Sequence, residues 1–404
     1  MEWKEVTLGD LCEISSSKRI FAKEYQSDGV PFYRGKEIIA KQKGNAISNE
    51  LFISRNRYEE IKARYGVPQQ RELLLTSVGT LGVPYVIKEE EFYFKDGNLT
   101  WFRHFNGLDV EYLYYWFLSP YGKNEINTKA IGSTQKALTI DSLSKFDIKI
   151  PANLDDQRRI ASILSSLDRK IELNNKINAD LEEMAQAIFK NWFVDFEPFK
   201  DGKFVDSELG KIPEGWKVGR LTEIASYMNG LAMQKFPPEN NEDSLPVLKI
   251  KELGQGFCGT DSDRCSCNIK DECKIHNGDV IFSWSGTLLV DVWCGGDCGL
   301  NQHLFKVTSK DYPKWFYYYW TKHHLQEFIH IAKDKAVTMG HIKRGHLEEA
   351  LVAIPDNDSM ERAHELFEPI LSKMISLRLE NSRLSLLRDT LLPRLMSGEL
   401  EVPE

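Results

Sequence analysis

Six of the seven cysteines in this 404-residue chain lie in one part of its second half, where they could bind a metal. They are Cys258, Cys265, Cys267, Cys273, Cys294 and Cys298, and His276 lies near them. Structural zinc sites usually combine two cysteine pairs, each with two to four residues between its ligands. Here the closest spacings are C-x-C and C-x(3)-C, which do not give two such pairs. We therefore favour free thiols in a reducing compartment over a metal site.

The motifs of DNA-modifying enzymes are missing from the sequence. An adenine methyltransferase needs an Asn/Asp-Pro-Pro-Tyr/Phe tetrapeptide, whereas the only Pro-Pro pair here is in Phe236-Pro-Pro-Glu. The phosphate-binding pattern G-x(4)-G-K-S/T of motor proteins does not occur. Asp147-Ile-Lys149 and Glu272-Cys-Lys274 resemble parts of nuclease sites, but tripeptides this short recur by chance in a chain that is 28% charged. We predict no catalytic residues, with a nuclease as the less favoured alternative.

The elements that carry the remaining candidate residues are repeated along the chain. A short strand that runs into a helix at residues 3–15 has a counterpart at 216–230. Each is followed by an extended segment with two basic residues, a buried strand that ends in a turn of small residues, and an aromatic helix. These paired segments are 30–36 and 245–251, 72–81 and 278–288, and 110–118 and 315–329. The repeat indicates two similar globular halves, with both aromatic helices in the core.

Each half is followed by a stretch in which seam positions recur alternately every four and three residues. The first seam comprises Ile160, Leu164, Leu167, Ile171, Asn174, Asn178, Leu181, Ala185, Ile188 and Trp192. The positions 203 residues further on are Ala363, Phe367, Ile370, Met374, Leu377, Asn381, Leu384, Arg388, Leu391 and Leu395. A helix of this kind spans about 50 Å, which is too long for one small domain to cover. We therefore predict that the two helices pack together as a coiled coil.

The net charge of −8 does not exclude a nucleic-acid partner, because the acidic excess lies on and beside the long helices. Residues 1–150 carry 21 basic and 20 acidic side chains, and residues 216–354 carry 16 and 17. Nearly neutral halves can hold local basic patches, and affinity for DNA depends on such patches. The sequence has no run of 18 apolar residues and no signal peptide, so we expect a cytoplasmic protein without membrane contact.

Short motifs in a fixed order point to a known family. The first long helix opens with Asp156-Gln157 and ends in Phe189-Lys-Asn-Trp-Phe-Val-Asp-Phe-Glu-Pro198, and Gly210-Lys-Ile-Pro-Glu-Gly-Trp216 opens the second half. Gly132-Ser-Thr-Gln135 lies late in the first half, and Leu391-Leu-Pro-Arg-Leu-Met-Ser-Gly-Glu-Leu400 lies near the C terminus. Within the twofold repeat, these motifs resemble the specificity (S) subunit of type I restriction-modification enzymes. The resemblance covers essentially the whole chain.

This resemblance implies an α+β fold with a pseudo-twofold internal repeat, in which two long helices join two similar target recognition domains and form an antiparallel coiled coil. Each domain would read half of an asymmetric, interrupted site in double-stranded DNA. The helix pair would dock two methyltransferase (modification) subunits, and the complex can recruit restriction (translocase and nuclease) subunits. Such a holoenzyme is an adenine-N6 DNA methyltransferase and a type I endonuclease. This chain would be its non-catalytic subunit and bind no cofactor, with S-adenosylmethionine and ATP on the partner subunits.

The boundaries expected on this basis divide the chain into five parts. Residues 1–152 and 216–355 form the two target recognition domains. Residues 153–197 and 356–404 form the two long helices. Residues 198–215 are rich in proline, glycine and charge, and form a linker between the first helix and the second domain.

Lysine and arginine can bind phosphates, while glutamine, asparagine, arginine or histidine can read base edges. In the first half, the candidate DNA contacts are Arg34, Lys36, Lys41, Lys43, Ser77, Thr80, Ser133, Thr134, Gln135 and Lys136. In the second half, they are Lys249, Lys251, Ser283, Ser285, Thr287, Asn301, Gln302, His303, Lys335 and Lys343. The second half departs from the family pattern, because Thr338-Met339-Gly340-His341 stands where the first half has Ser133-Thr134-Gln135.

Two half-sites read from one face of a duplex lie about one helical turn apart, roughly 34 Å. A rigid helix pair can hold two domains at such a separation, so its length would set the number of unread spacer base pairs. In a pseudo-twofold pair, equivalent residues face each other only near the crossing point. We expect Asn178 and Asn381 to meet there and fix the register. A coiled-coil scaffold that binds only proteins is an alternative, but it leaves the duplicated globular halves unexplained.

Overall fold

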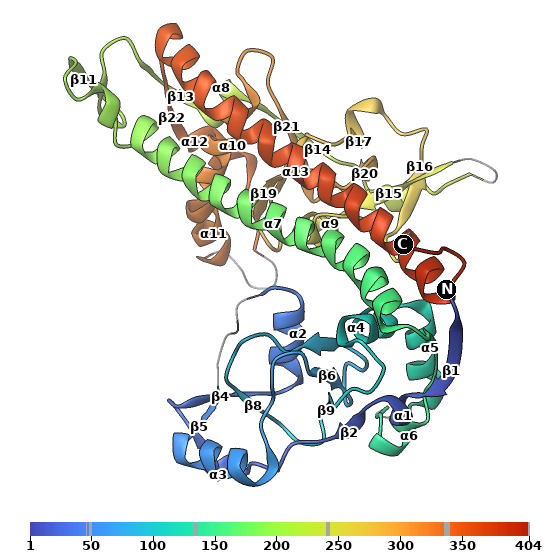
Figure 1. Ribbon diagram of the computed structural model, residues 1–404. Coiled ribbons are helices and arrows are strands. Elements are labelled where there is room, and N and C mark those ends of the chain that lie inside the picture. The colour runs from blue at the N-terminus through green and yellow to red at the C-terminus, as the bar shows by residue number, and fades with distance from the viewer. Residues whose placement is uncertain (46, 48–50, 133–135, 240–242, 335–339, 403–404) are drawn as a thin grey trace. The chain divides into compact units, whose positions relative to one another are not determined.

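The computed structural model describes residues 1–45, 47, 51–132, 136–239, 243–334 and 340–402. The chain divides into two compact units, Met1–Glu172 with Leu384–Glu404, and Leu173–Arg383. Each unit contains one globular domain and one end of each long helix, which are α7 (Leu154–Phe193) and α13 (Asn357–Ser397). Figure 1 draws α7 in green and α13 in red. Each unit has its own hydrophobic core, and residues of both helices belong to it.

The first domain combines small sheets with short helices. Its elements are β1 (Trp3–Thr7), α1 (Leu8–Leu11), β2 (Glu13–Ser15), η1 (Ala22–Glu24), β3 (Tyr25–Gln26), β4 (Val30–Tyr33), α2 (Gly35–Gln42), β5 (Leu51–Ile53), α3 (Arg55–Tyr65), β6 (Leu73–Thr76), β7 (Pro84–Val86), β8 (Tyr93–Phe94), β9 (Leu99–Arg103), α4 (Val110–Leu118), α5 (Pro120–Lys129), α6 (Ile140–Ser144) and β10 (Asp147–Pro151). The strand orders are β2-β9-β6-β7, β3-β5-β4-β8 and β1-β10. Among these pairs, β4 and β8 alone run parallel.

The second domain follows a hairpin of β11 (Phe204–Ser207) and β12 (Gly210–Pro213). The other elements are η2 (Glu197–Phe199), β13 (Lys217–Arg220), α8 (Leu221–Ile224), β14 (Ser226–Asn229), η3 (Met233–Lys235), β15 (Ser244–Leu248), α9 (Ile250–Gln255), β16 (Arg264–Ser266), η4 (Asp271–Cys273), β17 (Lys274–Ile275), β18 (Val280–Ser283), β19 (Leu289–Val292), β20 (Cys298–Leu300), β21 (Leu304–Thr308), α10 (Lys314–His323), α11 (Leu325–Asp334), α12 (Arg344–Glu349) and β22 (Leu351–Ile354). The strand orders are β14-β21-β18-β19, β16-β15-β20-β17 and β13-β22.

The two domains repeat one topology, as the sequence predicts. The order β14-β21-β18-β19 matches β2-β9-β6-β7, and the parallel pair β15-β20 matches β4-β8. The outer strands of the second sheet differ, because β3 extends this sheet beyond β5 in the first domain, whereas β17 extends it beyond β20 in the second. The domains therefore share a framework and differ at the edges of one sheet.

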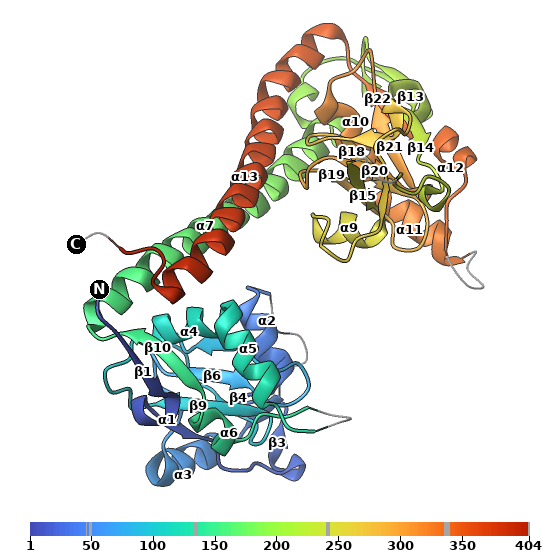
Figure 2. The same cartoon turned by 90° about the vertical axis from the view of Figure 1, so that its right-hand side faces the viewer.

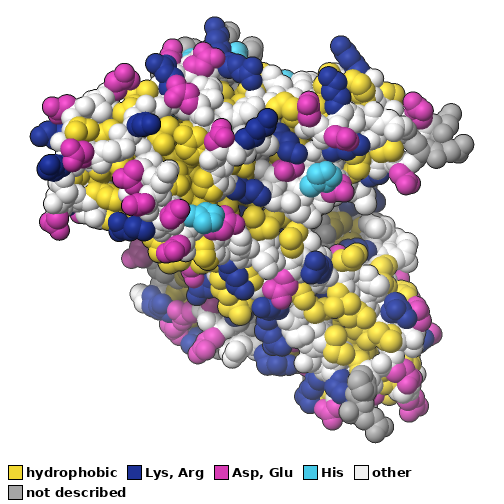
Figure 3. All heavy atoms as spheres, turned by 90° about the horizontal axis from the view of Figure 1, so that it is seen from above, with side chains coloured by type: hydrophobic (Ala, Val, Ile, Leu, Met, Phe, Trp, Pro, Cys, Tyr) yellow, Lys and Arg dark blue, Asp and Glu magenta, His cyan; other side chains and the backbone are white. Residues whose placement is uncertain are grey.

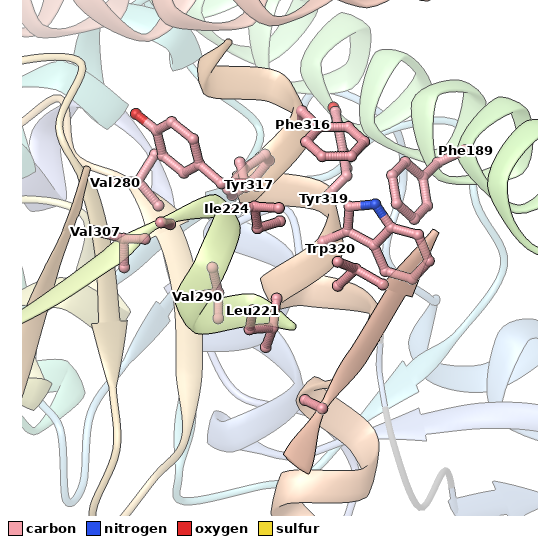
Figure 4. Packing of buried hydrophobic residues seen from close by; sticks show 14 of the residues in the cluster. Phe189, Leu221, Ile224, Val280, Val290, Val307, Phe316, Tyr317, Tyr319 and Trp320 are labelled. Carbon is pink, nitrogen blue, oxygen red and sulfur yellow. The ribbon is translucent and has the colours of Figure 1, made fainter. Parts of the chain in front are cut away.

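The aromatic helices lie in the cores, in agreement with their spacing, but the segment 315–329, expected as one helix, is divided between α10 and α11. Helix α4 packs next to β7. Helix α10 packs next to β19 and β21, and the three are labelled close together in Figure 2. In the second unit, the ring centroid of Phe189 from α7 lies 5.1 Å from that of Trp320 from α10 (Figure 4). The long helix is thus part of the domain core, because its aromatic side chains fill the space beside α10.

The segment 198–215, expected as a linker, contains the β11–β12 hairpin. The turn of this hairpin is closed by a hydrogen bond of 2.7 Å from the hydroxyl of Ser207 to the carbonyl of Gly210, which has a φ of 84°. Such a φ favours glycine. Ile212 and Trp216 are buried in the core of the second unit, so the hairpin and the residues after it are packed against this core.

Within the second unit, α7 and α13 run antiparallel. Asn174 donates from Nδ2 to the Oδ1 of Asn381 at 2.9 Å. Further along α7, the ring of Phe189 lies 6.2 Å from that of Phe367, which comes earlier in α13. In the first unit, Asp168 of α7 accepts a hydrogen bond of 2.7 Å from Arg388 of α13. The antiparallel coiled coil is confirmed by these pairings.

The register contact involves a different asparagine of α7 from the one that we expected. Asn381 accepts from Asn174 and donates to the Oδ1 of Asn175 at 2.8 Å. Asn174 is fully buried and also donates to Glu380 at 2.9 Å. Asn178 lies about one turn further along α7, so in an antiparallel pair it faces a level about one turn before Asn381. Its Oδ1 is buried and has no hydrogen-bond partner.

We expect leucine at position 381 to destabilise the second unit by about 1–3 kcal/mol, because the buried amide of Asn174 would lose one of its two acceptors. Leucine at both positions should recover most of this loss, since an apolar pair leaves no unsatisfied polar group between these positions. Urea unfolding of Asn174→Leu, Asn381→Leu and the double variant measures the coupling. A double variant that is no more stable than either single variant would contradict this role of the contact.

Candidate nucleic-acid interface

A cavity of about 700 Å³ in the second domain brings together polar and basic side chains from distant parts of the sequence. It is lined by Met233, Gln234, Val247, Lys249, Ile250, Lys251, Asp263, Arg264, Asn301, Gln302 and His303. These residues come from η3, the end of β15, the start of α9, the start of β16 and the turn between β20 and β21. The residues already predicted as DNA contacts from the sequence are Lys249, Lys251, Asn301, Gln302 and His303.

Two lysines of the cavity have acidic partners. The ammonium group of Lys249 pairs with Asp263, and that of Lys251 lies 2.6 Å from the Oδ2 of Asp261. The second contact raises the pKa of Lys251 and lowers the pKa of Asp261. All four side chains are at least 43% exposed. Exposed ion pairs contribute little to stability, so a DNA phosphate can replace the aspartates at small cost.

The basic pairs of both domains lie at helix starts and not in the extended segments expected for them. Strand β4 ends before Arg34, and β15 ends before Lys249. The backbone N–H of Arg34 donates to the carboxylate of Glu37 at 2.9 Å, and that of Lys249 donates to Glu252 at 3.3 Å. Each glutamate caps the N-terminus of a helix, α2 or α9, and this capping turns the chain out of the strand.

The basic residues of the first domain differ in how tightly carboxylates hold them. The guanidinium of Arg34 donates to Glu37 at 2.7 Å, and Glu37 is buried. Burial raises the pKa of Glu37, but the hydrogen bonds from Arg34 outweigh this effect and leave the pKa below its ordinary value. Lys41 pairs with Glu90 at 2.6 Å. Arg34 and Lys41 are therefore already engaged within the domain.

The other predicted contacts fall into three groups. The exposed ones are Lys36, Lys43, Thr80, Lys136, Thr287 and Lys343. Ser77, Ser283 and Ser285 are buried. The hydroxyl of Ser77 lies 2.6 Å from that of Thr100, and the hydroxyl of Ser283 donates to the carbonyl of Ser285 at 3.2 Å. These two hydroxyls hold the turns that follow β6 and β18. Ser133, Thr134, Gln135 and Lys335 lie outside the described residues, as do Thr338 and Met339.

A set of side-chain contacts fixes the turn after β20. The Oδ1 of Asn301 accepts the backbone N–H of His303 at 3.2 Å. The Nδ1 of His303 lies 3.1 Å from the hydroxyl of Ser285, and its Nε2 lies 3.4 Å from the Nε2 of Gln302. The ring of Trp284 lies 5.9 Å from that of His303. The turn therefore presents Gln302 and His303 in a defined arrangement at the cavity.

The cavity also includes residues that we did not predict. Gln234 lies in η3, and Arg264 starts β16, where its Nε donates to the hydroxyl of Ser244 at 2.8 Å. Asp261 and Asp263 precede this strand. The sequence repeat does not extend to this segment, so comparison of the halves gave no signal there. The one available signal was the charged run Asp261-Ser-Asp263-Arg264.

The surface carries both signs of charge and several exposed apolar residues. Figure 3 shows Lys and Arg interspersed with Asp and Glu, with hydrophobic side chains between them. The large hydrophobic residues exposed on the long helices are Leu173, Met184, Leu366, Leu386 and Leu387. Exposed apolar residues that gather on one surface are candidates for contact with another protein.

Over the described part of the chain, no helix is long and apolar enough to cross a membrane. The same residues contain no group of three or more His, Cys, Asp or Glu side chains that could hold a metal ion. The seven cysteines are free thiols. Burial raises the pKa of Cys12 to about 12, so this thiol stays protonated at neutral pH.

Two similar domains attached to an antiparallel helix pair define a class of protein with a duplicated recognition module. The family model for the type I restriction modification DNA specificity domain matches residues 1–183 and 213–378. The chain therefore belongs to the family of type I restriction-modification specificity subunits, which supply the DNA sequence specificity of these systems.

Relatives agree with this family, and a solved structure shares the fold. The MjaIX specificity subunit of Methanocaldococcus jannaschii is 28% identical over 424 residues, which cover 100% of this chain and 94% of that protein. The HindI specificity subunit of Haemophilus influenzae is 24% identical, covering 65% of this chain and 71% of that protein. The crystal structure of a type I S subunit from M. genitalium has the same fold, with a TM-score of 0.57, 15% identity and coverage of 98% and 96%.

Proposed function

We propose that this chain selects an asymmetric, bipartite DNA site, with each target recognition domain reading one half. The cavity of the second domain carries this proposal, because it combines ammonium and guanidinium groups suited to phosphates with side-chain amide groups suited to base edges. The first domain repeats the sheet order and the capped basic pair, while its outer strands differ. Two similar but unequal readers fit a site whose halves differ in sequence.

The long helices are proposed to determine how many base pairs between the half-sites stay unread. Helix α7 has 40 residues and α13 has 41, so each spans about 60 Å. Half-sites read from one face of the duplex lie about 34 Å apart. Helices of this length can bridge such a distance, and packing along their shared seam stiffens them. The spacer would then follow from helix length.

Two methyltransferase subunits are proposed to bind equivalent positions on the two helices. Met184 is 44% exposed on α7, and Leu387 is 47% exposed on α13. The two residues are 203 positions apart in the sequence, which is the interval of the repeat. Each long helix therefore carries an exposed apolar side chain at the equivalent position. A repeated contact fits two copies of one partner. These partners would bind S-adenosylmethionine and methylate adenine at N6, and ATP-dependent restriction subunits would join the same complex.

Co-purification with a methyltransferase, followed by DNA protection, separates this function from its alternatives. We expect the complex to protect two short segments of a duplex, with unprotected base pairs between them. A coiled-coil scaffold would bind the partner and protect no DNA. A nuclease would cleave DNA in the absence of any partner. Either of these two results would overturn the proposal.

Lys36 and Lys251 occupy equivalent positions, two residues after the N-capping residue of α2 or α9. Alanine at either position should reduce the slope of log affinity against log salt concentration by about 1, because one phosphate contact is lost. The loss of affinity should be similar for all DNA sequences. Titration of the assembled complex with duplex DNA at several salt concentrations measures the slope, and Lys200→Ala outside both domains is the control. A Lys251→Ala variant with the wild-type slope would remove this residue from the contacts.

A further inference from the structure

The side-chain amide of Gln302, which lines the cavity, makes only part of the hydrogen bonds that it can make within the protein. Its Nε2 contacts the Nε2 of His303 at 3.4 Å. Its Oε1 is buried and has no hydrogen-bond partner. Buried polar atoms in folded proteins nearly always have a partner, so an unpaired acceptor at the wall of a cavity calls for an explanation.

The histidine beside it has no free ring nitrogen. The Nδ1 of His303 contacts the hydroxyl of Ser285, and its Nε2 contacts the amide nitrogen of Gln302. An amide nitrogen can only donate, so the Nε2 of His303 accepts from Gln302, and the Nδ1–H of the neutral ring donates to Ser285. Ser285 is buried and cannot easily move. The imidazole therefore serves to hold the glutamine amide.

One N–H donor and the C=O acceptor of the planar Gln302 amide remain available for hydrogen bonds to a ligand. In the major groove, adenine presents the complementary pair, an acceptor at N7 and a donor at N6, and glutamine is a side chain that binds both. The last torsion of a glutamine side chain is broad, so a small rotation can turn the amide toward a ligand. Lys249, Lys251 and Arg264 line the same cavity and can bind the adjoining phosphates.

We propose that Gln302 reads an adenine in the half-site of the second domain, and that His303 and Ser285 are positioning residues for its amide. This proposal rests on the proposed function, namely that the second domain reads DNA. It adds the base that is read and the residue that reads it. Asn301 supports the same arrangement, because its side chain holds the backbone N–H of His303.

The test replaces the chromosomal gene of the source organism with variant alleles and determines the methylated motif by sequencing modified bases. The wild-type motif should contain one invariant adenine in one half that Gln302→Ala relaxes, with discrimination against other bases falling on the order of 10- to 100-fold. Every other position should stay unchanged. Gln302→Glu keeps an acceptor and loses the N–H donor, so the preference at that position should shift toward cytosine, whose N4 amino group donates.

Ser285→Ala should weaken the preference at the same position, and Ser285→Thr should restore it, because threonine keeps the hydroxyl. Gln326→Ala alters an exposed glutamine of the same domain that does not line the cavity, and should leave the motif intact. If Gln302→Ala abolishes methylation altogether, the nearly isosteric Gln302→Glu decides the outcome. A motif unchanged by Gln302→Glu would overturn this proposal while the bipartite motif itself persists. Failure of the proposed function would instead appear as a wild-type motif that does not depend on this chain.

Discussion

Replacing Phe367 with alanine is expected to destabilise the second unit by about 3–5 kcal/mol, the usual loss for a fully buried phenylalanine. Phe367 has no exposed surface. Its ring stacks on Trp315 with centroids 4.7 Å apart and an angle of 12°, and lies 5.6 Å from Tyr319 and 6.1 Å from Phe193. These partners come from α10 and α7, so one side chain of α13 joins the domain to both long helices. The loss is a large share of the stability of a typical domain.

Urea unfolding followed by tryptophan fluorescence measures this loss. The chain has two units, so two transitions can occur, and only the one that belongs to the second unit should shift. Leu366→Ala is the matched control, because this neighbouring side chain is 41% exposed and its removal leaves no buried cavity. Equal effects of Phe367→Ala and Leu366→Ala would show that the aromatic cluster does not stabilise the unit as described.

Glutamate at Met184 or Leu387 is expected to release one methyltransferase subunit, and glutamate at both positions should release both. Burial of an unpaired carboxylate in an apolar contact costs several kcal/mol, which weakens binding by a factor of 100 or more, on the order of 1.4 kcal/mol for each tenfold change. The two residues are equivalent in the repeat, so each single variant should lose one copy. The mass of the purified complex distinguishes two copies, one copy and none.

Leu173→Glu is the control for this experiment. Leu173 is 52% exposed on α7, but the position 203 residues further on is Ser376, so this apolar residue has no counterpart in the repeat. The control variant should keep both methyltransferase subunits. Complexes that retain two copies with both Met184→Glu and Leu387→Glu would place the docking surface elsewhere.

The parts of the fold that could be predicted are those marked by a periodic sequence pattern. The seam of α7 and α13 follows from the spacing of apolar residues, and the interval of 203 residues revealed the repeated domains. The register of the helix pair could not be read in the same way, because it depends on which turns of the two helices meet. Asn174, one turn before Asn178, therefore forms the contact with Asn381. The β11–β12 hairpin was missed because it is short and has no counterpart in the repeat.

The candidate site could be predicted where polar residues follow strands and turns that are repeated in the two halves of the chain. Asn301, Gln302 and His303 follow β20 directly, and the structure places all three at the cavity. Arg264 and the two aspartates near it were missed, since they lie at or just before β16, in a segment where the two halves show no sequence repeat. Ser77 and Ser283 have the residue type of a contact but are buried, and burial at the end of a strand is not visible in composition.

Base modification across the genome of the source organism, sequenced with and without this chain, tests the central claim most directly. We predict that one motif with two defined segments, separated by a fixed number of undefined base pairs, is methylated only when the chain is present. Return of the gene should restore the same motif. A genome in which every methylated motif survives loss of the chain, or in which an uninterrupted motif is lost, would contradict it.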